Sequence, residues 1–556
     1  MTRHRMPGLL GALALAAATL AAAHPAAAAG PAPAPPAAAA PAAAAPPAGG
    51  VPPEFGTDWH DPLTADPPVL RPPTRSCELT VAEARFRDFT PYRGRYTPPA
   101  GCGTGPWAKV VLRLEGKVKG RQYDRLGHLS LGGVEILRTS TPEPSPDGIT
   151  WTVEKDVTRY RDTLSRPQPV EMLIGNVVNE TYTGVIDVKA TLVFHTAERH
   201  HPAPDTPDRV IPLTSPAVTT PRNTERLLAE VYATGSGGGC EEYWYLTVPD
   251  AAPYSCKAAD GPHREVRISV DGRLAGIAAP FPHVWTGGWS NPFLWYVSPA
   301  PRTFDVKPVV YDLTPFAALL NDGREHRIEV SVAGLPAGRP GWSTPVNLLI
   351  WQDEGRPVVT GSLTRHEEEQ PSGSSRWTPA SDGEPHRLDT SGSHRLTTAG
   401  RLDTSHGRIT TTVTRSVGLT SLHRWTDGED RDALTAVWTD EESTTRGAAT
   451  TRTARTYTVD GETTLGAGGR LRTVLTVADR ADTAVLRGGR TVDRSRLDHR
   501  YTGDASYTAN VPREERRAVG TTTERYRVYG AQAPGGCYDR TVSTAQGTVT
   551  ADRRRC

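Results

Sequence analysis

Apolar and polar residues alternate along much of the chain, a pattern typical of strands that bury one face of a sheet. The runs Lys109–Leu114 and Gly184–Phe194 show it in the first half of the chain. Turn-forming stretches such as Pro142–Gly148 separate these runs, whereas helical periodicity is scarce. The pattern therefore predicts an all-β protein built from antiparallel β-sandwiches.

The same pattern divides the chain into units. Residues 55–205 and 206–355 are predicted to be two adjacent β-sandwiches, the second with a hairpin signal at Asp271–Gly272. Residues 356–405 are polar and rich in Ser, and we predict a flexible linker there. Residues 406–556 are rich in Thr and Arg and alternate in polarity, which indicates a meandering C-terminal β domain. A disordered tail is the alternative for this last unit.

The N-terminus has the features of an export signal. Residues 1–29 begin with basic side chains, continue through an apolar stretch and end in small residues. Residues 30–54 consist almost entirely of Ala, Pro and Gly and are predicted to form an extended linker. An uncleaved anchor is the alternative, but the apolar stretch is short and weakly hydrophobic for a bilayer span. We predict cleavage and secretion, with no membrane association afterwards.

Six cysteines follow this segment and fall into three local couples, separated by 25, 16 and 19 residues. An even number of cysteines in an exported chain indicates disulfides. The predicted pairs are Cys77–Cys102, Cys240–Cys256 and Cys537–Cys556. A zinc site is the rival interpretation, but the chain has no CxxC and no His at ligand spacing from any Cys. We expect no metal and no other cofactor.

Charge and motifs exclude several classes of function. The 63 basic and 62 acidic side chains leave a net charge of +1, which gives no field for binding nucleic acid. The sequence contains no GxSxG elbow, no P-loop, no HExxH and no EF-hand loop. Nucleophilic serine, phosphate and metal chemistries therefore have no support, and carboxylates remain as candidate catalytic groups.

Specific strings in the first two units resemble a known family. They are Gly120-Arg121-Gln122-Tyr123-Asp124-Arg125, Trp151-Thr152-Val153-Glu154-Lys155, Arg222-Asn223-Thr224-Glu225-Arg226, Glu242-Tyr243-Trp244-Tyr245 and Thr286-Gly287-Gly288. In this order, from about Phe55 to Glu354, the chain resembles the peptide-N4-(N-acetyl-β-glucosaminyl)asparagine amidase A family, the plant-type acidic peptide:N-glycanases. The resemblance implies two jelly-roll sandwiches with an active site at their interface. It also implies hydrolysis of the amide between asparagine and the first GlcNAc of N-linked glycans, with N-glycopeptides or glycoproteins as substrates.

Two acidic residues match functional positions of the related flavobacterial-type N-glycosidase. They are Asp124 and Glu242, while a third acid of that enzyme has no clear counterpart, because the matching region is Gly175-Asn176. Amide hydrolysis without a metal needs a carboxylate that deprotonates water and a donor for the developing oxyanion. We expect Asp124 to activate water and Glu242 to hold the amide or N-acetyl group. An Asp124–Arg125 surface ion pair and a solvated glutamate are the structural alternatives.

Neighbouring side chains are candidates for substrate binding. An arginine can stabilise negative charge, and aromatic rings can stack on a sugar face. The candidates are Tyr123, Arg125, Tyr243, Trp244, Trp285 and Trp289. The alternative for the tryptophans is a place in the sandwich core.

Two other functions use the same features. A glycosidase could employ the same two carboxylates, provided that they lie about 5–10 Å apart. A non-catalytic glycan-binding protein could use the sandwiches as platforms.

Overall fold

The computed structural model describes residues 60–556 except for 103–104, 144–147, 236–238, 286–291, 296, 336–340, 510 and 513–514. The predicted signal and the Ala/Pro linker lie outside the described residues. The fold is all-β with antiparallel sheets, as predicted. None of the helices in the described part has the length and apolar character that a bilayer span requires.

The first β-sandwich contains two four-stranded sheets, in the orders β1-β8-β3-β6 and β2-β7-β4-β5. Its strands are β1 (Ser76–Phe86), β2 (Tyr92–Tyr96), β3 (Trp107–Lys119), β4 (Leu126–Leu131), β5 (Val134–Ser140), β6 (Ile149–Asp156), β7 (Gln168–Ile174) and β8 (Val185–Thr196). Alternate side chains of these strands fill the space between the sheets, where Trp107 and Phe194 lie 4.9 Å apart between ring centroids. The alternation in the sequence therefore marks the buried faces.

The second β-sandwich pairs the sheets β10-β16-β13-β14 and β15-β11-β18-β9, and a small sheet β12-β17 lies beside them. The strands are β9 (Arg209–Pro212), β10 (Ala217–Val218), β11 (Thr224–Val231), β12 (Thr234–Gly235), β13 (Glu265–Val270), β14 (Arg273–Ala278), β15 (Val309–Asp312), β16 (His326–Ala333), β17 (Trp342–Ser343) and β18 (Val346–Gln352). Asp271 and Gly272 join β13 to β14 with φ angles of 48° and 77°, which confirms the predicted tight hairpin.

Helices are short throughout the described residues. They are η1 (Ala100–Cys102), η2 (Thr158–Tyr160), α1 (Arg161–Leu164), η3 (Cys240–Leu246), η4 (Pro292–Leu294), η5 (Thr314–Phe316), α2 (Ala317–Leu320), η6 (Ala467–Gly469) and η8 (Pro534–Gly536). The three predicted disulfides are present, Cys77–Cys102, Cys240–Cys256 and Cys537–Cys556.

The C-terminal part forms one 11-stranded antiparallel sheet, in which successive strands are neighbours from β21 to β29. The strands are β19 (Thr360–Glu368), β20 (Ser372–Thr378), β21 (His386–Thr404), β22 (Gly407–Trp425), β23 (Arg431–Arg446), β24 (Ala449–Gly466), β25 (Arg470–Arg487), β26 (Arg490–Thr508), β27 (Val519–Tyr529), β28 (Cys537–Ala545) and β29 (Thr548–Arg554). The predicted β meander is confirmed.

The predicted linker at residues 356–405 is wrong, because these residues contain β19, β20 and β21 of the same sheet. On β21, Leu388, Leu396 and Leu402 are buried on the inward face, but Thr390 and His394 are buried there too. The polar residues on the inward face weaken the apolar alternation that reveals a strand.

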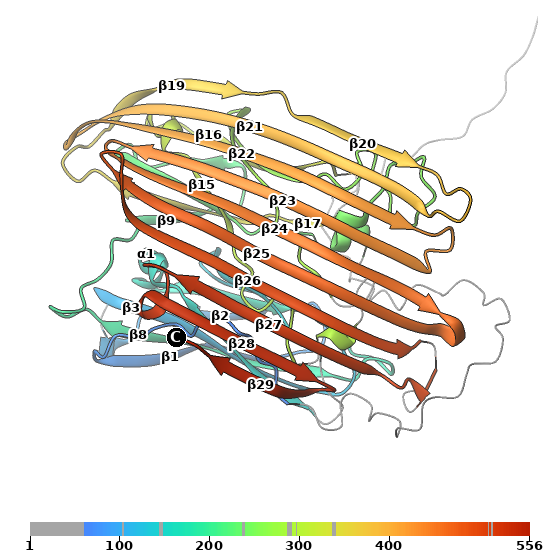
Figure 1. The fold of residues 1–556 in the computed structure, drawn as a ribbon. Coiled ribbons are helices and arrows are strands. Elements are labelled where there is room, and N and C mark those ends of the chain that lie inside the picture. Colours follow the sequence, from blue (N-terminus) through green and yellow to red (C-terminus); the bar gives the residue numbers. More distant parts are fainter. Residues whose placement is uncertain are drawn as a thin grey trace, which may run out of the picture.

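The long sheet lies across both sandwiches (Figure 1). Trp425, Trp438 and Tyr501 of its inward face are buried in one hydrophobic cluster with Trp244 and Trp295 of the second sandwich. The C-terminal sheet therefore shares a core with the rest of the molecule instead of folding as a separate appendage.

The two sandwiches are joined by a buried arginine. Arg138 at the end of β5 pairs with Glu135 at 2.7 Å and donates hydrogen bonds to Thr234 Oγ1 (2.7 Å) and Ser343 Oγ (3.0 Å). Thr234 and Ser343 belong to the small sheet β12-β17, which contacts η3. The planar guanidinium of Arg138 donates its hydrogen bonds in fixed directions. These bonds hold β5 against the part of the second sandwich that contacts η3.

Candidate active site

Asp124 lies in the connection between β3 and β4, and hydrogen bonds hold this connection on two sides. The side chain of Gln122 donates to the carbonyl groups of Val177 (2.9 Å) and Gly184 (2.8 Å). On the other side, the Arg125 N–H donates to Thr141 Oγ1 at 2.9 Å. The half-buried Asp124 side chain is therefore presented by a fixed backbone segment.

Two phenol rings lie near the guanidinium of Arg125, the residue that follows Asp124. Arg125 donates two hydrogen bonds to Gln122 Oε1, at 2.8 and 3.2 Å, and lies over the Tyr182 ring at 5.9 Å. The Tyr123 ring is 5.4 Å from that of Tyr182. Burial lowers the pKa of Arg125, and the charge of Asp124 opposes that shift. The arginine remains a cation beside Asp124, so the predicted positions of Tyr123 and Arg125 are compatible with roles in binding.

A further acid, Glu143, lies in the same region and was not predicted. Its side chain is 3% exposed, and its charge acts on the pKa of Arg125 and of Tyr507. The pKa of Tyr507 is raised mainly by burial, and the charges of Tyr123 and Glu143 contribute. Glu143 stands next to a proline, with no motif around it, so the sequence contained no signal for its position.

Glu242 lies in η3, within the loop that the Cys240–Cys256 disulfide closes. The preceding residue, Glu241, is buried and forms a two-bond ion pair with Arg264 at 2.8 and 3.0 Å. Glu241 thus has a structural role, which fixes the turn. Glu242 is half-buried.

The aromatic candidates divide into two groups. Tyr243 is half-buried, and burial together with the charge of Glu242 raises its pKa. Trp244 is 2% exposed, with Trp438 of the C-terminal sheet at 5.4 Å, and Trp285 is 9% exposed. The expectation that Trp244 and Trp285 stack on a sugar is corrected, because their burial places both rings in the core. The candidate Trp289 lies outside the described residues.

The two acid-bearing segments border one hydrophobic cluster. Leu126, two residues after Asp124, packs against the cluster that contains Trp244 and Trp285. Cys240 and Tyr243, on either side of Glu242 in η3, pack against the same cluster. Neither Asp124 nor Glu242 is buried inside a core.

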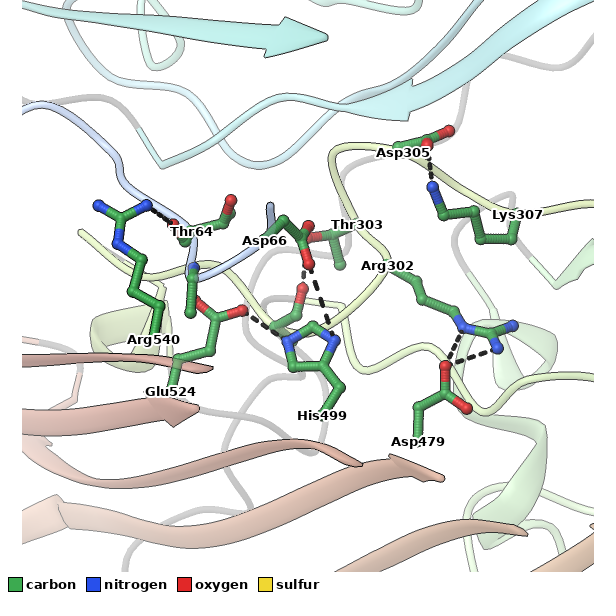
Figure 2. A network of polar contacts seen from close by, with 12 residues as sticks. Thr64, Asp66, Arg302, Thr303, Asp305, Lys307, Asp479, His499, Glu524 and Arg540 are labelled. Carbon is green, nitrogen blue, oxygen red and sulfur yellow. Dashed lines mark hydrogen bonds and ion pairs between the residues drawn. The ribbon is translucent and has the colours of Figure 1, made fainter. Parts of the chain in front are cut away.

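Within the described residues, one group has the side chains of a metal site: Asp66, His499 and Glu524. Figure 2 shows that these side chains face one another, and His499 Nε2 lies 2.7 Å from Glu524 Oε1. Glu524 Oε2 also accepts a hydrogen bond from the Ala65 N–H at 2.7 Å. Asp66 Oδ1 lies 3.9 Å from His499 Nδ1, so these contacts attach the segment before β1 to the C-terminal sheet.

The fold is that of an all-β protein with two sandwiches, and it leaves the candidate acids Asp124 and Glu242 half-buried. The sequence model described as "Peptide N-acetyl-beta-D-glucosaminyl asparaginase amidase A" matches residues 67–369, and the chain belongs to this family. The C-terminal sheet from β20 onward lies outside the matched region.

The chain is also similar to individual known proteins. The chain is 31% identical over 338 residues to peptide-N4-(N-acetyl-beta-glucosaminyl)asparagine amidase A of Prunus dulcis. That match covers 54% of this chain and 58% of the relative, so the chain spans less than two thirds of the relative's length. Two solved structures of PNGF-II are 15% and 14% identical, with TM-scores of 0.35 and 0.33. Each match covers 50% of this chain, and the two matches cover 65% and 66% of the respective PNGF-II chains.

Proposed function

We propose that this protein hydrolyses the amide bond between asparagine and the first GlcNAc of N-linked glycans. The observation that carries the proposal is the common hydrophobic cluster, against which the segments bearing Asp124 and Glu242 both pack. Membership of the amidase A family and the printed name of the Prunus dulcis relative support the same reaction. The substrates are N-glycopeptides or glycoproteins.

Asp124 is the base in this mechanism. It takes a proton from water, the water oxygen attacks the amide carbon, and the carbonyl oxygen acquires negative charge. Arg125 supplies a positive charge beside the attacking group and stabilises the developing oxyanion. The carbon–nitrogen bond then breaks, Asp124 returns the proton to the nitrogen, and the products are a glycosylamine and an aspartate side chain.

Glu242 and the phenol rings position the substrate. Glu242 accepts hydrogen bonds from the amide or N-acetyl group, and Tyr123 and Tyr182 offer ring faces to the first sugar. Glu143 supplies a second carboxylate, besides Asp124, whose negative charge acts on Arg125.

Export of the protein is part of the proposal. Three disulfides stabilise the chain, and disulfides persist in oxidising compartments outside the cytosol. An extracellular enzyme meets mature glycoproteins and their proteolytic fragments, which are the proposed substrates.

Mass analysis of a purified N-glycopeptide after incubation tests the function. Conversion of the glycosylated asparagine to aspartate is expected, whereas a peptide that retains one GlcNAc, or an unchanged peptide, would refute amidase action. The Asp124→Asn variant should lose activity by at least about 10²-fold, because general-base catalysis is worth that much. Glu242→Gln should raise KM more than it lowers kcat.

A further inference from the structure

The outward face of strands β25–β29 is rich in arginine. These strands lie side by side at one end of the long sheet (orange to red in Figure 1). The side chains of this face alternate with buried ones such as Val477, Tyr501 and Val542, so they point away from both sandwiches. The face lies outside the matched region 67–369, so membership of the amidase A family assigns no role to it.

Two aspartates of this face are each shared by two arginines. Asp498 of β26 lies 3.1 Å from Arg480 and 3.2 Å from Arg527, on the strands at either side. A second trio, with contacts of 2.6 and 3.0 Å, consists of Asp482, Arg494 and Arg496. The side chains of both trios are between 32% and 61% exposed. Each trio therefore presents a net charge of +1 to the solvent.

A row of three arginines crosses the sheet beside these trios. Arg500 of β26 lies directly opposite Arg525 of β27, and like charges in such a position destabilise a sheet. Arg553 of β29 continues the row, with Thr541 of β28 in between. Asp539 neutralises Arg525 at 2.6 Å, but the exposed side chains of Arg500 and Arg553 form no ion pair or hydrogen bond with any described residue. The stability of the sheet does not explain this row.

The charges of the face match an anionic partner. The two trios together with Arg500 and Arg553 carry a net charge of +4, while the whole chain carries +1. Two further ion pairs of the face are neutral, Arg525–Asp539 and Arg472–Asp504. Neighbouring strands lie about 4.8 Å apart, so the row from Arg500 to Arg553 spans about 14 Å. Guanidinium groups bind carboxylates through two parallel hydrogen bonds, and a row of this length reaches several carboxylates of one chain.

The spacing of the charges and an exposed ring favour a polysaccharide over a nucleic acid. Duplex DNA carries one negative charge per about 1.7 Å of its axis, whereas the cations here are at least one strand spacing apart and aspartates stand between them. Tyr529, on the same face of β27, is 39% exposed, and Arg527 lies 5.9 Å from its ring centroid. Such a ring offers an apolar face to a sugar beside the guanidinium. We propose that the outward face of β25–β29 binds an acidic polysaccharide with one carboxylate per sugar.

Calorimetric titration of the full-length protein tests this ligand class. The probes are a galacturonate decamer, the same decamer with its carboxyl groups methyl-esterified, and a ten-residue oligodeoxythymidylate. The free acid should bind with a Kd below about 1 mM and at least about tenfold more tightly than either other probe. Failure of the free acid, or equal binding of the ester or the oligonucleotide, would overturn the proposal. None of the probes contains an asparagine-linked amide, so the result does not depend on the proposed hydrolysis.

Charge reversal at one arginine locates the binding. Arg500→Glu should weaken binding of the free acid at least about tenfold. Arg424→Glu is the matched control, because Arg424 is also exposed and has no side-chain ion pair or hydrogen bond with a described residue, but lies on β22, four strands from β26. It should change the affinity less than about threefold. Binding that survives Arg500→Glu, or that is lost equally in both variants, contradicts the proposed location.

Thermal unfolding separates this role from a structural one. Arg500→Glu places an acid opposite Arg525, and opposite charges in that position stabilise a sheet. The Tm of this variant should therefore equal or exceed that of the wild type while binding is lost, and a Tm that falls together with the affinity contradicts the assignment. If Arg500→Glu does not fold, Arg500→Gln decides the matter. It should weaken binding by about twofold to fivefold, and unchanged affinity contradicts the role of Arg500.

Discussion

The loop that carries Glu242 is fastened to the C-terminal sheet by a buried tyrosine, and removal of one oxygen atom tests what this contact does. The Tyr254 hydroxyl donates to Asp432 Oδ2 at 2.6 Å, two residues before the disulfide that closes the loop. His423 Nε2 lies 2.6 Å from the other oxygen of Asp432. Tyr254→Phe therefore removes one link and leaves the carboxylate with a partner.

The structure gives a magnitude for this change. A hydrogen bond to a charged group contributes about 1.5–3 kcal/mol, and Asp432 keeps His423, so the free energy of unfolding should fall by about 2 kcal/mol. Tyr96→Phe is the control, since Tyr96 is also buried and donates at 2.6 Å to the neutral Leu164 carbonyl. Its expected cost is about 1 kcal/mol.

The assay compares urea unfolding and glycopeptide hydrolysis for both variants. Tyr254→Phe should raise KM several-fold, with a smaller effect on kcat, at temperatures where the protein stays folded, because the loop that presents Glu242 to the substrate becomes less well fixed. Tyr96→Phe should leave KM unchanged. An unchanged KM in Tyr254→Phe, or an equal rise in both variants, would refute the claim that the C-terminal sheet positions this loop.

Two further predictions concern local structure and pH. Gly235→Ala should lower the free energy of unfolding by more than about 2 kcal/mol, because a Cβ there would lie 2.1 Å from the Glu241 carbonyl oxygen. Gly239→Ala is the control: a Cβ there would have nothing within 4 Å, so the loss should be less than about 1 kcal/mol in thermal unfolding. Burial lowers the pKa of His499, but the hydrogen bond to Glu524 and the nearby carboxylates outweigh burial and raise the pKa overall. Protonated His499 therefore stabilises the fold at low pH, and this contribution is lost as the pH rises through the raised pKa. The stability deficit of His499→Gln should therefore be larger at pH about 5.5 than at pH about 9, and a deficit that grows with pH would contradict this assignment.

Local patterns were sufficient to predict the β class, the meander and the hairpin at Asp271–Gly272. They were not sufficient where the identity of the inward-facing residues depends on a distant partner. His394 of β21 is buried because Glu265 of the second sandwich lies 2.9 Å from it, and a sequence window around His394 contains no sign of that partner. The predicted linker failed for this reason.

In the candidate site, too, some features could be predicted from local sequence and others depended on distant residues. Asp124 and Glu242 stand in recognisable strings, and the structure leaves both half-buried beside one cluster. The exposure of Trp244 could not be predicted, because Trp438, which covers it, lies 194 positions later in the chain. Glu143 was missed because only the folded connection brings it to Arg125.

A crystal structure of the Asp124→Asn variant with a bound N-glycopeptide tests the central claim most directly. The account predicts that the glycosylated asparagine lies between the two sandwiches, with residue 124 and Glu242 each within about 3 Å of the amide, of the N-acetyl group or of one intervening water. A substrate that contacts only one of these side chains, or that binds elsewhere on the molecule, would contradict it.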